Sequence, residues 1–354
     1  MSDPVSDPTP GSIDPVETHR ITRRGLLLSL PALAFARALF AETRPAPLPL
    51  LGLHEVTLAV SDLERSLEFY QELFGMPVLA RDDSSVVLRV GPGPRFLKLT
   101  RAGATPPRIQ QLGVAVDRFA VDRMVEALDE HGVTPDATSG GLRPGPMSLR
   151  VTTRGETPEI HIADPHGIVI QFHDPTDCGG SGPVGGRCLP ASTSPAVGVL
   201  APVDFSHLTM YVPDADRADA FYQDAFGLEI QARQGAQLAL GVGPNRHFLM
   251  FVGTGPGRGR AGGPAQGRID HACLTVADFS VERVQGVLER FGISPRGATS
   301  PRPLQHWVSM RMPNRGGATG GTPELYFSDP DGLSIQLQDP AYCGGGGYLG
   351  EVCG

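Results

Sequence analysis

The chain has 354 residues, of which 40% are hydrophobic and 19% are charged, and its formal net charge is −8. This composition is typical of a globular protein with room for two domains. The mild acidity and the absence of a basic run argue against nucleic-acid binding.

The N-terminus is predicted to be an export signal. Residues 1–15 are rich in Ser, Asp and Pro and are expected to be disordered. Arg23 and Arg24 then precede an apolar run to Ala41 that is too short to span a membrane comfortably. This pattern looks like a twin-arginine signal peptide, with a membrane anchor or an amphipathic helix as the alternatives. We exclude residues 1–41 from the fold and expect a periplasmic or secreted protein with no stable membrane anchor after cleavage.

The rest of the chain contains an internal repeat. The first half opens with a predicted strand at 53–60 and closes with the motif at 174–182. A matching strand at 206–212 opens the second half, and the related motif at 339–347 closes it. The repeat predicts two halves built on one plan.

Helices follow the opening strands at matched places. In each half a Phe-Tyr-Gln segment and a further Phe precede a Gly suited to a C-cap. Asp62 and Asp214 lie near the expected helix starts, where acidic residues favour the helix dipole. Each half has a second predicted helix, at 121–131 or 281–291, followed by strands.

The last stretch of the chain carries the most specific pattern. A short strand led by His271 and a helix precede a hairpin whose turn is Asp329-Pro330-Asp331-Gly332, where Pro and Gly fit the central positions. Strand side chains alternate between faces. The expected polar faces therefore comprise His271, Cys273 and Thr275 on the first strand, and Ser334, Gln336 and Gln338 on the last.

A His-led strand, a helix and a closing Asp-Pro-x-Gly hairpin resemble the vicinal oxygen chelate superfamily. That superfamily includes glyoxalase I, bleomycin-resistance proteins and extradiol ring-cleaving dioxygenases. Its unit is a βαβββ module, and paired modules curl into a cup that usually holds a divalent metal. The resemblance implies an α+β fold in which four modules, at about 52–100, 108–175, 204–253 and 267–340, pair into two cup-shaped domains.

The expected domain boundaries follow from these modules. We place the first domain at 50–178, a linker at 179–200, the second domain at 201–343 and a Gly-rich tail at 344–354. The first domain is interpreted as structural and the second as the carrier of the site.

Four of the five cysteines form two evenly repeated pairs. The interval from Cys178 to Cys188 equals that from Cys343 to Cys353. In an exported protein such pairs look like two local disulfides that staple Gly-rich loops to their domains, although a soft-metal site is an alternative. Cys273 is left over as either a packed or a pocket-lining thiol.

Metal ligands in the superfamily come from the first and last strands of each module. The corresponding residues are His207, Met250, His271 and Gln336 in the second half, and His54, Lys98, Gln111 and Gln171 in the first. The resemblance to extradiol dioxygenases implies His207, His271 and Gln336 as ligands, with Gln336 in place of the usual Glu. Two histidines and an oxygen donor are close to the triad that holds non-haem Fe(II).

The resemblance therefore favours Fe(II), with Mn, Zn or Ni as other possible metals. The alternative is that the same histidines line a metal-free pocket. In the first half, Lys98 would place a cation where the metal should sit, which is why that half is read as structural.

Further residues of the second half are expected around the metal. His306 and Tyr211 are the predicted acid–base groups, because an imidazole titrates near neutrality and a phenol can donate a proton; for His306 a plain strand-edge histidine is the alternative. Other predicted pocket residues are Thr209, Cys273, Thr275, His247, Trp307 and Tyr326.

Three functions remain open at this stage. The first is a metal-dependent enzyme resembling extradiol dioxygenases, with a small catechol-like substrate. The second is a metal-free exported protein that sequesters a small molecule, as in bleomycin resistance. The third is a glyoxalase-like isomerase or lyase. The only partner expected is a small molecule.

Overall fold

The computed structural model describes residues 48–136, 145–189, 197–244, 246–254, 266–297 and 303–354. The predicted signal segment, 1–41, lies outside these residues. All described residues fall within one contact unit, Ala46–Gly354. Within this part of the chain, no helix combines the length and the apolar character needed to cross a membrane.

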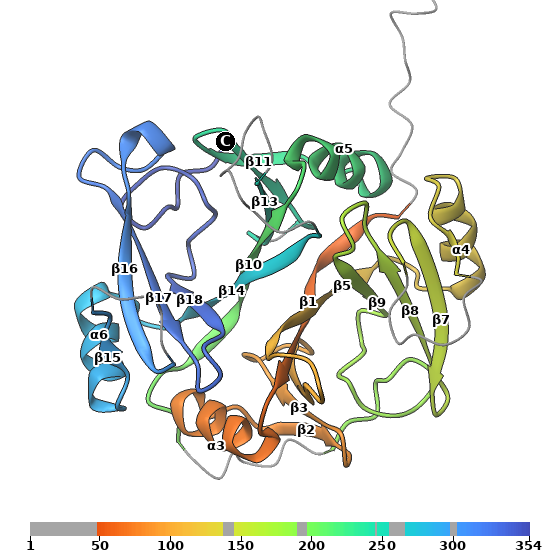
Figure 1. Ribbon diagram of the computed structural model, residues 1–354, viewed down its shortest axis with the longest axis horizontal. Helices are drawn as coiled ribbons and strands as arrows, with labels where there is room; N and C mark the ends of the chain where they lie inside the picture. Colours follow the sequence, from red (N-terminus) through yellow and green to blue (C-terminus); the bar gives the residue numbers. More distant parts are fainter. Residues whose placement is uncertain (1–47, 137–144, 190–196, 245, 255–265, 298–302) are drawn as a thin grey trace, which may run out of the picture. The chain divides into compact units, whose positions relative to one another are not determined.

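The first half forms one nine-stranded sheet with two helices (Figure 1). Its elements are β1 (Leu50–Val60), α3 (Leu63–Phe74), β2 (Val78–Arg81), β3 (Ser85–Arg89), β4 (Phe96–Arg101), β5 (Arg108–Val116), α4 (Val121–Asp129), β6 (Thr134–Pro135), β7 (Ser148–Arg154), β8 (Thr157–Ala163) and β9 (Val169–His173). The strand order is β2-β3-β4-β1-β5-β9-β8-β7-β6, so the antiparallel pair β1 and β5 joins the two modules.

The second half repeats this topology. Its elements are β10 (Pro202–Val212), α5 (Ala215–Phe226), β11 (Ile230–Gln234), β12 (Gln237–Gly241), β13 (Phe248–Gly253), β14 (Arg268–Val276), α6 (Val281–Arg290), β15 (Ser294–Pro295), β16 (Gln305–Arg311), the 3-10 turn η1 (Pro313–Arg315), β17 (Thr322–Ser328) and β18 (Ser334–Gln338). The order β11-β12-β13-β10-β14-β18-β17-β16-β15 confirms the predicted α+β fold of two paired-module halves.

Local cap chemistry fixes the ends of α3 and α5. The carboxylate of Asp62 accepts two backbone N–H groups of the first turn of α3, and Asp214 accepts one at the start of α5. Both helices end at a glycine in the left-handed region, Gly75 at φ 64° and Gly227 at φ 65°. The predicted helix starts and stops are confirmed at both places.

The two halves share one hydrophobic core. Buried apolar side chains from both sheets belong to a single cluster, with Leu58 and Leu112 in the first half and Leu208 and Leu274 in the second. The opposite face of each sheet carries the polar side chains of a cup. Because the core is continuous, the predicted domains pack as parts of one body.

Helices α3 and α5 each pack against the opposite half (Figure 1). The Tyr70 hydroxyl of α3 donates to Asp329 Oδ2 over 3.1 Å, at the turn between β17 and β18. In the same way, Tyr222 of α5 donates to Asp164 Oδ2 over 3.3 Å, at the turn between β8 and β9. The two halves thus exchange equivalent helix contacts.

The two predicted disulfides are present. Cys178 is bonded to Cys188 and Cys343 to Cys353, and the Cα atoms are 6.2 and 6.3 Å apart. Each bond closes a Gly-rich loop that contains a short antiparallel bridge.

Equivalent side chains hold the two loops. Arg154 donates to the carbonyl of Gly180, and Arg311 donates to that of Gly345. The backbone N–H of Leu189 donates to Leu79 of β2 over 2.9 Å. The residues 179–189 therefore pack on the first half, although the sequence predicted a linker there.

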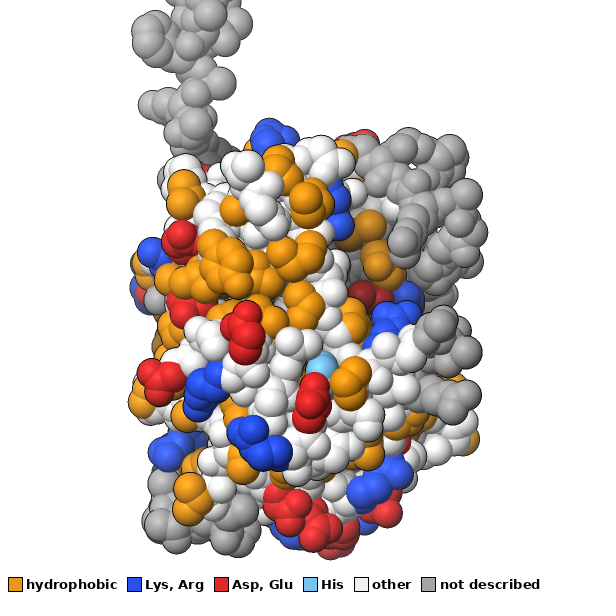
Figure 2. All heavy atoms as spheres, turned by 90° about the vertical axis from the view of Figure 1, so that its left-hand side faces the viewer, with side chains coloured by type: hydrophobic (Ala, Val, Ile, Leu, Met, Phe, Trp, Pro, Cys, Tyr) orange, Lys and Arg blue, Asp and Glu red, His pale blue; other side chains and the backbone are white. Residues whose placement is uncertain are grey.

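One outer face is shown in Figure 2, which views the side of the molecule that lies on the left in Figure 1, where β16 and α6 are drawn. Apolar side chains gather in one patch on this face, and acidic and basic side chains are interspersed around it. Near the end of β16, Met310 and Met312 are 43% and 44% exposed. Because acidic and basic side chains are interspersed on this face, its charges do not form a patch of a single sign.

Candidate metal centre

The cup of the second half encloses a cavity of about 1230 Å³. Strands β10, β13, β14, β17 and β18 contribute the central part of its wall, and the first half contributes residues 107–110 and 167–169. The cavity therefore lies where the two halves meet, and a molecule bound in it would contact both.

His207 and Gln336 come together in the floor of this cavity. They lie on β10 and β18, the two neighbours of β14, and both stand opposite Cys273 in the register. His207 Nε2 is 3.1 Å from Gln336 Oε1. Two ligands bound at right angles to one divalent ion, each about 2.1 Å from it, lie about 3.0 Å apart. This separation therefore fits a shared metal ion.

His271 completes the set. It lies on β14 two residues before Cys273, so the two side chains share one face of the sheet. Its ring centroid is 5.6 Å from that of His207, and its Nδ1 lies 3.1 Å from a carboxylate oxygen of Asp270. A carboxylate on the far nitrogen is the usual support for a metal-binding histidine, because it fixes the tautomer and the ring orientation. His271 Nε2 is thereby left to face the cavity.

Two buried nitrogens at this place have no hydrogen-bond partner among the described residues: His271 Nε2 and Gln336 Nε2. Such atoms are uncommon in folded proteins and point to a place that binds a ligand, a water or an ion. Burial, followed by the neighbouring His271, lowers the pKa of His207 well below its usual value. The imidazole of His207 is therefore neutral, which is the form that binds metal.

The candidate centre depends on an amide oxygen. Within the described residues, no group of three or more His, Cys, Asp or Glu side chains is arranged to hold a metal ion. The donor set His207, His271 and Gln336 consequently contains no carboxylate. The 3.1 Å separation of His207 Nε2 and Gln336 Oε1 fits a divalent cation, but a donor set without a carboxylate would leave the full positive charge of that cation in place.

A carboxylate that the sequence reading missed also lines the cavity. Glu324 of β17 accepts Arg311 Nε over 2.8 Å and the Tyr342 hydroxyl over 3.2 Å. The internal repeat contains the signal for this pair, because Arg154 Nε and Glu159 make the same 2.8 Å contact in the first half. In both halves the arginine of this pair also donates to a carbonyl of the disulfide loop, so the contact between Glu324 and Arg311 is a structural one.

An apolar wall holds the imidazole of His207. Its ring stacks on Phe248 at 4.3 Å with an interplanar angle of 8°, and the Tyr342 ring lies 5.5 Å away. Tyr342 directly precedes Cys343, so the disulfide loop positions part of this wall.

An aromatic row leads from His271 along the cavity. The Tyr326 ring meets His271 edge-on at 5.2 Å, and Trp307 stacks on Tyr326 at 5.4 Å and 7°. Burial, and then the charge of Glu324, raises the pKa of Tyr326 well above its usual value. Tyr326 therefore keeps its proton and can act as a hydrogen-bond donor.

The remaining predicted residues fall into two groups. Four of them line the cavity: Thr209, Tyr211, Trp307 and Tyr326. Cys273 and Thr275 are buried in the sheet and do not line it. Burial raises the pKa of the Cys273 thiol well above its usual value, so it is a packed, unreactive group.

His306 and His247 lie away from the cavity, in contrast to their predicted roles. The His306 ring faces helix α6, where Nε2 is 3.4 Å from Glu289, because Trp307 takes the cavity face of β16. His247 accepts the backbone N–H of Leu53 over 3.1 Å and links the two halves. These placements argue against an acid–base role for His306 and a pocket role for His247.

The first half uses different residues at the matching positions. Glu55, and not His54, occupies the place of His207, because Glu55 stands opposite Phe96 as His207 stands opposite Phe248. Both opening strands have the same register shift, between residues 53 and 55 in β1 and between 205 and 207 in β10, so His54 corresponds to Ser206 and not to His207.

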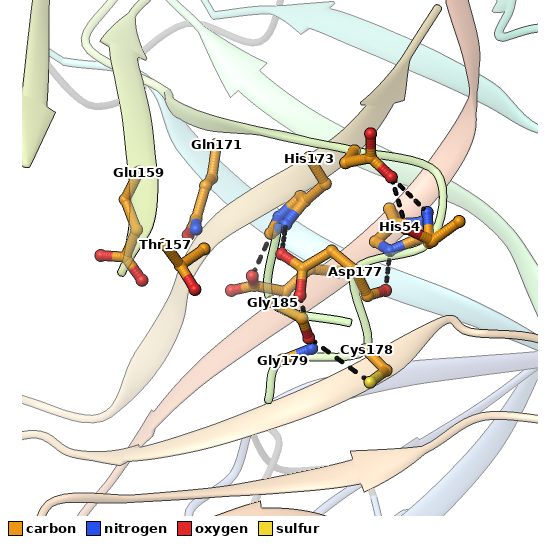
Figure 3. A network of polar contacts seen from close by, with 12 residues as sticks. His54, Thr157, Glu159, Gln171, His173, Asp177, Cys178, Gly179 and Gly185 are labelled. Atoms are coloured by element: carbon orange, nitrogen blue, oxygen red, sulfur yellow. Dashed lines mark hydrogen bonds and ion pairs between the residues drawn. The ribbon is translucent and has the colours of Figure 1, made fainter. Parts of the chain in front are cut away.

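A buried ionic network fills the first cup (Figure 3). His173 lies between two carboxylates, with Nε2 3.1 Å from Glu55 and Nδ1 2.8 Å from Asp177. Burial by itself would lower the pKa of His173, but the hydrogen bonds and charges of Asp177 and Glu55 outweigh it and raise the pKa to about 9. The His54 ring stacks on His173 at 5.1 Å, and its Nε2–H donates to the Asp177 carbonyl over 2.6 Å.

The amides of the first cup also pair with each other. Gln111 Nε2 donates to Gln171 Oε1 over 2.7 Å, at the positions that correspond to His271 and Gln336. In the first cup His173 Nε2 makes no aligned hydrogen bond but lies 3.1 Å from a carboxylate oxygen of Glu55, whereas His271 Nε2, Gln336 Nε2 and Thr209 Oγ1 in the second cup have no partner among the described residues. This contrast supports the second cup as the site.

Family comparison identifies the fold's relatives. The model of the Glyoxalase/Bleomycin resistance protein/Dioxygenase superfamily matches residues 52–172 and 204–337. The chain belongs to this superfamily. None of the curated proteins that were compared matches the sequence.

Solved structures of the superfamily share the fold at low identity. The 2,3-dioxygenase LapB from Pseudomonas sp. KL28 is 16% identical with a TM-score of 0.55, and the match covers 82% of this chain and 92% of that chain. A Mn(II)-bound glyoxalase from Novosphingobium aromaticivorans is 15% identical with a TM-score of 0.53, and the match covers 82% of both chains. Homoprotocatechuate 2,3-dioxygenase from Brevibacterium fuscum, in complex with 3,4-dihydroxyphenylacetate, is 18% identical with a TM-score of 0.56 and coverages of 84% and 83%.

Proposed function

We propose that this protein is a metal-dependent enzyme that acts on a small molecule with two vicinal oxygen atoms, in the manner of extradiol dioxygenases. The observation that carries the proposal is the convergence of His207, His271 and Gln336 on one large cavity, with two buried nitrogens that lack partners. The dioxygenases and the Mn(II)-bound glyoxalase among the solved relatives agree with this class of chemistry.

Three side chains would hold the metal: His207 and His271 through Nε2, and Gln336 through Oε1. Fe(II) is favoured by the two-histidine set, with Mn, Zn or Ni as other candidates. When bound, the metal would supply Lewis acidity and a template for the two vicinal oxygens.

The chain's own residues have separate tasks. Asp270 holds the Nδ1–H of His271, which keeps Nε2 directed at the cavity. Trp307 and Tyr326 form an aromatic wall for a planar substrate. The protonated Tyr326 phenol beside His271 donates to Glu324 over a long 3.5 Å, and it would turn from there to donate to a developing oxyanion.

Metal content after purification, measured together with O₂ uptake, tests the proposal. His207→Ala or His271→Ala should lose the metal, because each removes one of three protein ligands, and Gln336→Glu should hold it more tightly because a carboxylate restores negative charge. His54→Ala, which alters the first cup, is the matched control and should retain the metal. Full metal retention in both the His207 and His271 variants would refute the centre.

The identity of the metal then separates the enzyme classes. Bound Fe with catechol-dependent O₂ uptake supports a dioxygenase, and Mn, Zn or Ni without O₂ uptake supports glyoxalase-like isomerase or lyase chemistry. One observation favours a metal-free binding protein as the second candidate: the 3.1 Å contact between His207 and Gln336 is also a normal hydrogen-bond length. Tight ligand binding by metal-free protein would support that candidate. We also propose export by the twin-arginine pathway to the periplasm or medium.

A further inference from the structure

Four arginines line the cavity of the second cup. They come from separate elements: Arg108 begins β5 in the first half, Arg268 begins β14, Arg296 follows β15, and Arg315 ends η1. Their convergence on one cavity from both halves is a feature of the folded chain and not of any single motif.

The acidic side chains near them are already paired. Among the described residues that line the cavity, the carboxylates are Asp270 and Glu324. Asp270 lies 3.1 Å from Arg268 and 3.1 Å from His271, and Glu324 is held by the buried Arg311. Both carboxylates therefore already pair with a cation, and neither pairs with Arg108, Arg296 or Arg315.

Arg108, Arg296 and Arg315 have no carboxylate partner among the described residues. Arg108 donates to neutral oxygens, the carbonyl of Pro106 and the amide of Gln110, both over 3.2 Å. The guanidinium of Arg296 lies 5.1 Å from the centroid of the Trp307 ring. The internal segments outside the described residues contain no aspartate or glutamate that could serve instead.

The floor of the cavity adds no negative charge to balance these cations. Gln336 is an amide and stands where a carboxylate would compensate part of a metal's charge. Like charges converging on a concave site raise the local concentration of oppositely charged ligands. The cavity thus carries more arginines than carboxylates, and one of these arginines, Arg296, lies over the aromatic wall.

We propose that this cavity selects a planar ring that carries a carboxylate, with Arg296 and Arg315 as the specificity-determining residues and Arg108 contributing from the first half. The ring would lie along the wall formed by Tyr326 and Trp307, and the carboxylate would pair with the guanidinium groups, of which that of Arg296 lies over the Trp307 ring. The position of vicinal oxygens on that ring rests on the proposed function, whereas the preference for a carboxylate does not.

Metal-free protein provides the first arm of the test. Calorimetry compares phenylacetate with the neutral phenylacetamide of nearly the same shape. Phenylacetate should bind more tightly, and its advantage should shrink as salt is added. In the Arg296→Gln/Arg315→Gln double variant the affinity for phenylacetate should fall about tenfold, as expected for charge-assisted contacts at an exposed site, while that for phenylacetamide stays unchanged.

Two controls separate a site from a general charge effect. Arg118→Gln removes an exposed arginine far from the cavity lining and should leave both affinities unchanged. Arg296→Lys/Arg315→Lys keeps the charge and should recover part of the preference. The proposal would be overturned if the two ligands bind equally well, or if Arg118→Gln loses as much affinity as the double variant. It would also be overturned if phenylacetate binds to neither the metal-free nor the metal-loaded protein.

Metal-loaded protein provides the second arm, with 3,4-dihydroxyphenylacetate compared with 4-methylcatechol. Equal binding of these two ligands would refute the carboxylate preference while leaving the metal centre intact. A carboxylate preference in protein that never retains metal would instead refute the metal centre and leave this inference standing.

Discussion

Asp270 is the residue through which the metal centre can be tested without touching a ligand. Its carboxylate bridges His271 Nδ1 and Arg268, each at 3.1 Å. Supporting carboxylates of this kind fix the tautomer of the histidine and raise its basicity.

We expect Asp270→Asn to weaken metal affinity by about 10–100-fold with little loss of fold stability, because losing the supporting carboxylate of a ligand has effects of this size. Competition with a chelator measures the affinity, and the melting temperature checks the fold. Arg268→Gln is the matched control, since it breaks the other contact of Asp270 and should leave metal affinity nearly unchanged. Equal effects of the two substitutions would show that the histidine support is not what matters.

Single residues also show where sequence reasoning succeeds. Alternation along strands is enough to direct His207, His271 and Gln336 to one face, because all three lie on central strands whose opposite face is plainly apolar. On β16 the residues flanking His306 are Gln305 and Trp307, so the pattern does not fix which face is buried. For His54 the error is one position. The helix caps Asp62 and Asp214 are 152 residues apart, since 214 − 62 = 152, and the same interval pairs His207 with Glu55 and not with His54.

At the scale of elements, two buried turns respond to pH. Asp164 and Asp329 accept backbone N–H groups in the turns that also receive Tyr222 and Tyr70 from the opposite half. Burial raises the pKa of each carboxyl to about 6. The folded state then binds a proton more tightly than the unfolded chain, so this contribution to stability is present at acidic pH and is lost as pH rises from about 4 through 6.

We expect Asp329→Asn to cost more stability at pH 5 than at pH 7, with a difference of about 1 kcal/mol, because the substitution removes a proton uptake that favours the wild type at pH 5. Urea denaturation at the two pH values measures this difference. Tyr70→Phe removes a hydrogen bond that lowers the pKa of Asp329, so it should enlarge the pH dependence instead. An equal cost of Asp329→Asn at both pH values would contradict the assignment.

The elements themselves were largely predictable, but their partners were not. Helix ends follow from Asp62, Gly75, Asp214 and Gly227, whose effects are local. The aromatic pairs that end α3 and α5 indicate only that those helices bury a face. Which half they bury it against depends on contacts between residues hundreds of positions apart, such as Tyr70 with Asp329.

The whole molecule is expected to leave the cytoplasm after folding. Replacing Arg23 and Arg24 by Lys should retain the protein in the cytoplasm, because the paired arginines are the recognised part of a twin-arginine signal. Cell fractionation measures the distribution, and replacing Arg37 by Lys within the same N-terminal segment provides the control. Unchanged export of the double variant would contradict the prediction.

The overall plan of two cups was predictable from the internal repeat, but the shared core and the cavity between the halves were not. The repeat identifies equivalent segments, and it carries no information on how the two copies pack. The arginines of the cavity illustrate this limit, since Arg108 lies in the half that was expected to be purely structural.

The contact between α3 and the opposite half also determines when this helix can be buried during synthesis. Tyr70 is made 259 positions before Asp329, the residue that receives its hydroxyl. At roughly 5–20 residues per second, the aromatic end of α3 waits about 10–50 s on the ribosome before its partner strands exist. A nascent chain of this protein therefore exposes an unpaired apolar helix face for most of its translation, and we expect it to need chaperone protection until the last hairpin emerges.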